Sequence, residues 1–245
     1  MARWQQQGPL WQLHPSQGHA GTIAFIGGSY LAASPQLSYR RLLEALAARG
    51  WTVLAWSYVP GFDHQAQATE AWRAFHGASA WLEPKAGVRV RLGHSLGCKL
   101  HLLAPDGGRS CSGVVALSFN NFSAERSVPL LAELGQQLNF RSEFSPSPAE
   151  TLELVARSYR QPRNLLVRFD RDQLDQSARL LGVLQARPGD ASTLVNLPGD
   201  HLTPASGGLR RQMLGAWADD PQRARQIGQL AERISRWGCG DQTRS

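Results

Sequence analysis

The stretch from Val88 to Leu103 reads VRVRLGHSLGCKLHLL, and it decides how the rest of the chain is interpreted. Its first part, Val88 to Leu92, predicts a β-strand, and the part from Leu96 to about Leu103 predicts a helix. The residues between them form the motif Gly93-His94-Ser95-Leu96-Gly97. A Gly-x-Ser-x-Gly motif places its serine on a strained turn between a strand and a helix. Because the chain has 24 glycines, the pentapeptide alone is weak evidence, and its position gives it weight.

On both sides of this motif, short apolar runs alternate with amphipathic segments. The predicted strands are 22–26, 52–58, 88–92, 113–117, 164–169 and 192–197, and the predicted helices between and after them are 35–49, 66–82, 96–103, 174–186 and 221–237. This alternation is typical of an α/β domain with a mostly parallel sheet and helices on both faces. A chain of 245 residues is long enough to form one such domain with a substantial core.

The alternation breaks between residues 120 and 161, where no strand-like run occurs. Two helical segments are predicted there, around 128–138 and 149–159, and the second begins with the capping box Ser147-Pro148-Ala149-Glu150. We therefore expect residues 1–119 and 162–245 to form the core, and residues 120–161 to form a small helical lid inserted after the fourth predicted strand.

The bulk composition narrows the classes of protein. No run approaches the roughly 20 apolar residues that a membrane-spanning helix needs, and the start lacks a basic segment followed by an apolar run, so we expect neither export nor membrane spanning. The three cysteines, Cys98, Cys111 and Cys239, are odd in number and have no C-x-x-C spacing. We therefore expect no disulfide framework, no metal site and a reducing, cytoplasmic location.

The chain carries a net charge of +7, almost all of it from arginine, because only Lys85 and Lys99 are lysines. Basic proteins often bind nucleic acid. Here, however, the arginines are scattered in short pairs without a basic run or interleaved aromatic residues, so we expect a solvated surface and no nucleic-acid partner.

Ser95 is the predicted nucleophile, and a serine hydroxyl needs a base to remove its proton. Two histidines follow Ser95 in the sequence. His101 lies six residues on, within the same predicted helix, and cannot turn back to the serine. His201 lies in a loop directly after the last predicted strand, from which it can reach the carboxyl edge of the sheet. We therefore predict that His201 is the base.

The acid that orients this histidine should follow the strand 164–169. The sequence there is Phe169-Asp170-Arg171-Asp172-Gln173-Leu174-Asp175, and it offers three carboxylates. Asp172 suits a loop position facing His201, whereas Asp170 is close to the strand and Asp175 is close to the next helix. We favour Asp172 and keep Asp175 and Asp170 as alternatives.

An oxyanion that forms during attack by Ser95 needs two backbone donors. The N–H of Leu96 is one candidate, and the loop Gly27-Gly28-Ser29 after the first parallel strand offers Gly28 and Ser29 for the other. No Gly-x-Gly-x-x-Gly pattern follows this loop, so we expect no nucleotide cofactor, and no other cofactor is indicated. Cys98 and Lys99 are interpreted as packing and surface residues.

Four segments also resemble an uncharacterised family shared by cyanobacteria and plant plastids, described as domain of unknown function 1350. The segments are FIGGS at 25–29, GHSLGCKLHLL at 93–103, EFSPSP at 143–148 and QPRNLL at 161–166. The resemblance covers nearly the whole chain and implies an α/β-hydrolase fold with an intact serine site. It implies no substrate, and it does not choose between Asp172 and Asp175, which both lie in the Asp-x-x-Asp-Gln stretch that the family shares.

The pattern as a whole favours hydrolysis of a small-molecule carboxylic ester or thioester through an acyl-enzyme on Ser95. The predicted lid contains apolar residues that suit an acyl or lipid-like chain. Acyl transfer to an acceptor other than water is one alternative. A binding or scaffold protein that keeps the fold without turnover is another, although such a protein has no need to retain a complete serine, aspartate and histidine set.

Overall fold

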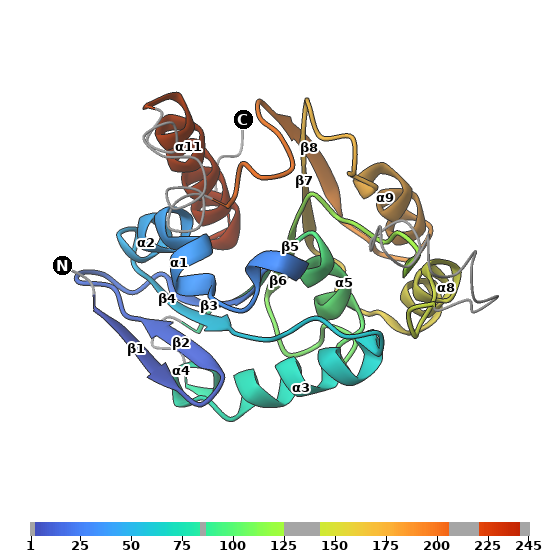
Figure 1. Ribbon diagram of the computed structural model, residues 1–245, viewed down its shortest axis with the longest axis horizontal. Coiled ribbons are helices and arrows are strands. Elements are labelled where there is room, and N and C mark those ends of the chain that lie inside the picture. The colour runs from blue at the N-terminus through green and yellow to red at the C-terminus, as the bar shows by residue number, and fades with distance from the viewer. Residues whose placement is uncertain (1–2, 84–86, 125–142, 206–220, 241–245) are drawn as a thin grey trace, which may run out of the picture.

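The computed structural model describes residues 3–83, 87–124, 143–205 and 221–240, and its centre is an eight-stranded sheet (Figure 1). The strands are β1 (Trp4–Gln7), β2 (Leu10–Leu13), β3 (Gly21–Ile26), β4 (Trp51–Trp56), β5 (Arg89–His94), β6 (Gly113–Leu117), β7 (Asn164–Phe169) and β8 (Thr193–Leu197). They follow the spatial order β1-β2-β4-β3-β5-β6-β7-β8. The strands from β3 to β8 pair in parallel, and β2 joins β1 and β4 in antiparallel pairs at one edge.

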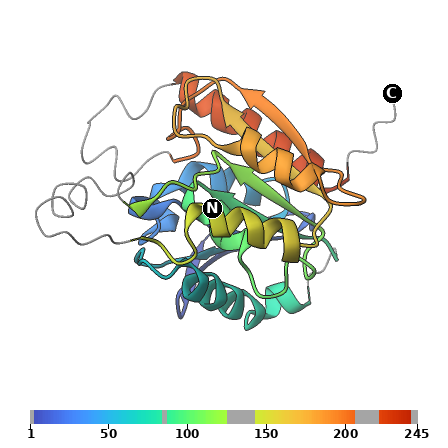
Figure 2. The same ribbon diagram turned by 90° about the vertical axis from the view of Figure 1, so that its right-hand side faces the viewer.

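Helices cover both faces of this sheet (Figures 1 and 2). They are η1 (Ser29–Leu31), α1 (Pro35–Ser38), α2 (Arg40–Ala47), α3 (His64–His76), α4 (Ser79–Leu82), α5 (Leu96–Leu102), α8 (Pro148–Ser158), α9 (Ser177–Gln185) and α11 (Pro221–Gly238). Helices α2 and α11 pack together on one face, and α3, α5, α8 and α9 lie on the other. None of the helices in the described ranges is long and apolar enough to cross a membrane.

The central strands are buried on both faces, as parallel strands between two helical layers must be. In β3 every residue is buried, and alternate side chains enter different clusters. Ile23 and Phe25 pack with the α2 and α11 side, whereas Ala24 and Ile26 pack with α3 and α5. This alternation explains why the strand reads as an unbroken apolar run.

The structure departs from the sequence prediction in three places. The hairpin of β1 and β2 was not predicted, although Gly8, which has a φ of 57°, marks its turn. The predicted helix 66–82 is divided into α3 and α4 at Gly77, and the predicted helix 35–49 is divided into α1 and α2 at Tyr39. The predicted lid helix 128–138 lies outside the described residues, whereas α8 begins at the predicted capping box.

Candidate active site

The predicted site residues lie in loops that follow the parallel strands, where the carboxyl ends of neighbouring strands meet at one edge of the sheet. Gly28 and Ser29 follow β3, Ser95 follows β5, Asp172 follows β7 and His201 follows β8. Residues far apart in the sequence are therefore brought to the same edge.

Ser95 lies on a strained turn between β5 and α5. Its φ of 54° and ψ of −120° are unusual for a residue with a side chain. The turn needs both flanking glycines, because a Cβ at Gly93 would lie 2.6 Å from the Cys98 nitrogen and one at Gly97 would clash with the carbonyl oxygen of Ile26. The backbone thus holds the Ser95 hydroxyl at the start of α5.

Three predicted side chains form a hydrogen-bonded chain. Nε2 of His201 lies 3.1 Å from Oγ of Ser95, and Nδ1 of His201 lies 2.8 Å from Oδ2 of Asp172. The Asp172 side chain is fully buried, and its Oδ1 accepts from the Leu174 N–H at 2.9 Å. Burial raises the pKa of Asp172, but the hydrogen bonds from His201 and its other donors outweigh burial and leave the pKa below its usual value. An ionised Asp172 accepts only, so His201 carries its proton on Nδ1 and turns the lone pair of Nε2 toward Ser95.

The other two aspartates of the loop have different partners. Asp175 accepts hydrogen bonds from the backbone and hydroxyl groups of Ser177, at the start of α9. Asp170 accepts from the N–H of Gly199 at 2.8 Å and so ties the loop after β7 to the loop that carries His201. The structure therefore brings Asp172 to His201 and uses Asp175 and Asp170 to shape the surrounding loops.

The predicted oxyanion donors differ in whether their N–H group already donates to an acceptor within the protein. The N–H of Gly28 donates to the hydroxyl of Tyr39 at 2.8 Å and is thereby occupied. Leu96 and Ser29 are the first residues of α5 and η1, where backbone N–H groups have no acceptor within the helix. Both residues line the cavity beside Ser95. The pair Leu96 and Ser29 thus suits an oxyanion better than a pair that includes Gly28.

Sequence reasoning missed the network that joins these loops. Nε2 of His94 lies 2.8 Å from the carbonyl oxygen of His201, and Nδ1 of His94 lies 2.8 Å from the Tyr39 hydroxyl. Because a carbonyl only accepts, His94 donates from Nε2, Tyr39 donates to Nδ1, and the Tyr39 oxygen accepts from Gly28. Burial lowers the pKa of His94 to about 3, so this residue stays neutral. The network connects the loop after β3 to the backbone of His201.

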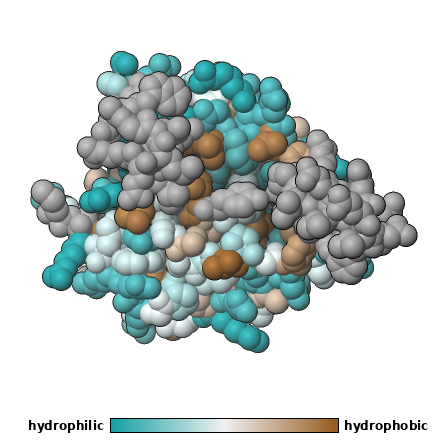
Figure 3. Space-filling model, in the orientation of Figure 1, coloured by the Kyte–Doolittle hydropathy of each residue, from teal (hydrophilic) through white to brown (hydrophobic). Residues whose placement is uncertain are grey.

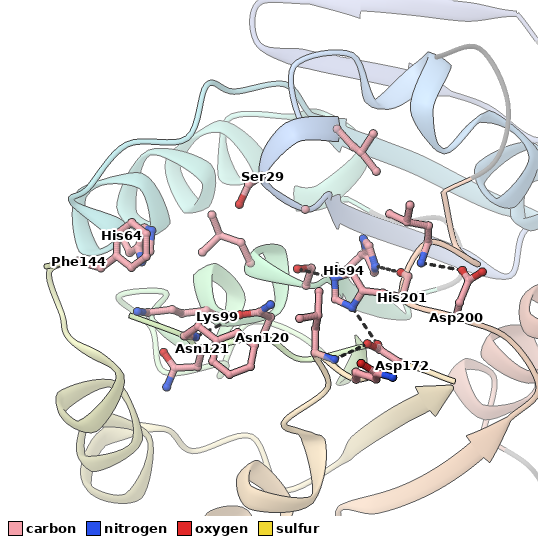
Figure 4. A pocket seen from close by; sticks show the side chains of 18 of the residues that line it. Ser29, His64, His94, Lys99, Asn120, Asn121, Phe144, Asp172, Asp200 and His201 are labelled. Carbon is pink, nitrogen blue, oxygen red and sulfur yellow. Dashed lines mark hydrogen bonds and ion pairs between the residues drawn. The ribbon is translucent and has the colours of Figure 1, made fainter. Parts of the chain in front are cut away.

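A cavity of about 730 Å³ opens over this site. Its apolar lining consists of Leu31, Leu96, Phe122, Phe144, Leu174 and Leu202. Figure 3 shows several hydrophobic side chains exposed around the middle of the face that Figure 1 presents, where α5 is labelled. Figure 4 shows His201 between His94 and Asp172, with Lys99, His64 and Phe144 on the opposite side of the cavity. The volume is in the range of sites for small organic molecules.

The interpretation of Lys99 as a surface residue was wrong. Its side chain is 1 % exposed and lines the cavity, whereas Cys98 is fully buried, as a packing residue should be. The signal that could have identified Lys99 is its spacing, because residues four apart lie on the same side of a helix and Ser95 stands four positions earlier.

No cluster of three or more metal-ligating side chains is found in the ranges that the structure describes.

Sequence comparison relates the chain to one protein family. A family model described as "Protein of unknown function (DUF1350)" matches residues 3–224. No curated protein sequence matches the chain.

Several solved structures are similar in fold. The esterase domain of a Rhodothermus marinus protein is 19 % identical, with a TM-score of 0.60 over 94 % of this chain and 91 % of that chain. Esterase 2 of Thermogutta terrifontis, in its form phosphonylated by sarin, is 17 % identical, with a TM-score of 0.59 over 97 % of this chain and 95 % of that chain. The thioesterase domain from the curacin biosynthetic pathway is 12 % identical, with a TM-score of 0.52 over 90 % of this chain and 99 % of that chain. These likenesses confirm the predicted α/β-hydrolase fold.

Proposed function

The chain belongs to the family of unknown function whose model spans residues 3–224, and from that premise we propose that it is a serine hydrolase that cleaves a carboxylic ester or thioester through an acyl-enzyme on Ser95. The observation that carries the proposal is the hydrogen-bonded chain from Asp172 through His201 to Ser95 beneath an open cavity. The esterase and thioesterase structures share the fold and add support at that level.

The reaction follows from this geometry in two halves. In the first half, His201 takes the proton of Ser95 on Nε2 as the serine oxygen attacks the carbonyl carbon, and Asp172 stabilises the resulting imidazolium. The N–H groups of Leu96 and Ser29 stabilise the oxyanion. His201 then protonates the departing alcohol or thiol, which leaves an acyl group on Ser95. In the second half, water attacks the acyl carbonyl carbon while His201 takes its proton, and His201 then returns that proton to the Ser95 oxygen as the bond to the acyl group breaks and the acid leaves.

The substrate is a small molecule with an acyl group that fits an apolar cavity. Leucine and phenylalanine side chains make up most of the nonpolar wall, which suits an acyl chain better than a sugar or a nucleotide. We also propose that residues 120–161 contain a lid over the site. Asn120, Asn121 and Phe122 at the start of this segment, and Phe144 within it, line the cavity and support that assignment, whereas α8 packs on the sheet face beside α9.

A panel of esters and thioesters with acyl chains of increasing length tests the proposed function. We expect turnover of at least one member, and we expect Ser95→Ala and His201→Ala each to lower kcat by about 10³-fold or more. Circular dichroism spectra of the variants control for folding. Turnover that is unchanged in Ser95→Ala would refute the acyl-enzyme. Absence of Ser95-dependent turnover across the panel would favour a binding protein, and an ester product formed with added alcohol would identify an acyltransferase.

A further inference from the structure

Lys99 is a buried cation in the wall of the cavity. It lies on α5 four residues after Ser95, and its side chain is 1 % exposed. Lysine is almost never buried to this extent without a partner for its charge. Its position in the site therefore requires an explanation that packing alone does not provide.

The ammonium group of Lys99 has three N–H donors, and one of them has a clear acceptor. Nζ donates to the carbonyl oxygen of Pro146 at 2.9 Å and lies 5.8 Å from the centre of the Phe144 ring. Among the described residues, no carboxylate lies within ion-pair distance of it. Glu143 and Glu150 are close enough to raise its pKa, but both side chains are exposed and accept from backbone N–H groups instead. The ammonium group of Lys99, with one of its three donors paired to Pro146, thus lies in the wall of the cavity.

Lys99 is positively charged at neutral pH although it is buried. Burial lowers its pKa to about 8, which leaves it mainly protonated at pH 7. His64 stacks on Phe144 with ring centres 4.2 Å apart, and burial lowers the pKa of His64 to about 3, so that it adds no charge. A buried charge without a close ion-pair partner is costly, and ionisable groups with pKa values shifted by burial cluster at functional sites.

The side of the cavity on which Lys99 lies indicates which part of a substrate it meets. His201 protonates the leaving group, so the alcohol or thiol departs on the His201 side, while the acyl group stays attached to Ser95. Figure 4 shows Lys99 together with His64 and Phe144 on the side away from His201. Resting on the proposed function, we infer that Lys99 binds a carboxylate at the far end of the acyl group, so that the preferred substrates are half-esters or half-thioesters of dicarboxylic acids.

A carboxylate fits this end of the cavity better than a phosphate. Phosphate sites usually combine several donors, such as a helix N-terminus or an arginine fork. Lys99 is instead a single ammonium group beside the aromatic ring of Phe144 and a neutral His64, which matches a single negative charge on an otherwise apolar chain.

The test compares two nitrophenyl esters of equal length, one with an acyl chain that ends in a carboxylate, such as adipate, and one with a methyl end, such as hexanoate. The measured quantity is the ratio of their kcat/KM values, which cancels any change common to both. We expect a ratio above about tenfold in favour of the carboxylate, and a fall of about tenfold or more in Lys99→Met. Arg171, an exposed cation that also lines the cavity, supplies the control, and Arg171→Gln should keep most of the preference.

The outcomes separate this inference from the proposed function. Ser95-dependent turnover without a carboxylate preference, or with a preference that Lys99→Met leaves intact, would overturn the inference and leave the hydrolase standing. If neither ester is turned over, thermal unfolding of Ser95→Ala in the presence of monomethyl adipate or methyl hexanoate decides the inference independently. Monomethyl adipate alone should then raise the Tm, and the additional change Lys99→Met should abolish that rise. An equal effect of both methyl esters would overturn the inference.

Discussion

The loop after β7 contains three aspartates within six residues, and the structure gives each a different partner. Asp172 reaches His201, Asp170 reaches the backbone of Gly199, and Asp175 reaches Ser177. The sequence favoured Asp172 by its distance from the strand but left all three open. The choice depends on how the backbone turns after Phe169, which composition and periodicity do not encode.

Exchange of Asp172 for asparagine tests its proposed role. The amide of the new side chain can present an N–H to His201 and favour the wrong tautomer, so we expect kcat for the best ester to fall by about 10³-fold to 10⁴-fold. Asp175→Asn is the matched control, and it should change kcat by less than about tenfold because its partner is Ser177. Equal losses in the two variants would contradict the assignment of Asp172 as the acid.

Tyr39 is proposed as a positioning residue through its bonds to Gly28 and His94. Tyr39→Phe leaves two buried groups without their partner, so we expect a loss of about 2 kcal/mol in the free energy of unfolding. We also expect kcat to fall about tenfold with little change in KM, because His94 supports the backbone of His201. Tyr58→Phe is the control. The Tyr58 hydroxyl donates to the carbonyl oxygen of Gly27 in the same loop, whereas it is the Tyr39 hydroxyl that bonds to Nδ1 of His94. The role of Tyr39 is refuted if both variants lose kcat equally.

At the scale of elements, the sequence located most of the parallel strands and their helices within a few residues. The strands 113–117 and 164–169 were predicted with the bounds that the structure shows. The hairpin of β1 and β2 was missed because its short, glutamine-rich strands lack the apolar run of a buried strand. The break at Tyr39 was missed because this residue continues the apolar face of a helix, while its hydroxyl is needed at the site.

The close packing of α5 on β3 gives a test of the turn at Ser95. Gly97→Ala would drive a Cβ into the backbone of Ile26, so we expect a loss of about 3 kcal/mol or more in the free energy of unfolding. Gly182 lies within α9, where an added Cβ would have no neighbouring atom within 4 Å, and Gly182→Ala should therefore stabilise the protein by about 0.5–1 kcal/mol. Urea unfolding of the two variants measures both changes. A Gly97→Ala protein as stable as the parent would contradict the packing described for this turn.

At the scale of the whole molecule, the order of elements was enough to place the site at one edge of the sheet. Parallel strands that alternate with helices must present their carboxyl ends together, so the sequence alone predicts that Ser95, Asp172 and His201 lie near one another. Lys99 and Tyr39 could not be assigned in this way, because their roles depend on burial and on partners contributed by distant segments.

The proposed reaction requires the hydroxyl of Ser95 to be an activated nucleophile, and reaction with a fluorophosphonate measures that reactivity. Intact-mass spectrometry should detect one covalent adduct per chain, peptide mapping should locate it on Ser95, and Ser95→Ala should remain unlabelled. His201→Ala should label far more slowly, because the base is missing. An unlabelled parent protein, or an adduct that persists in Ser95→Ala, would refute the role of Ser95 as nucleophile.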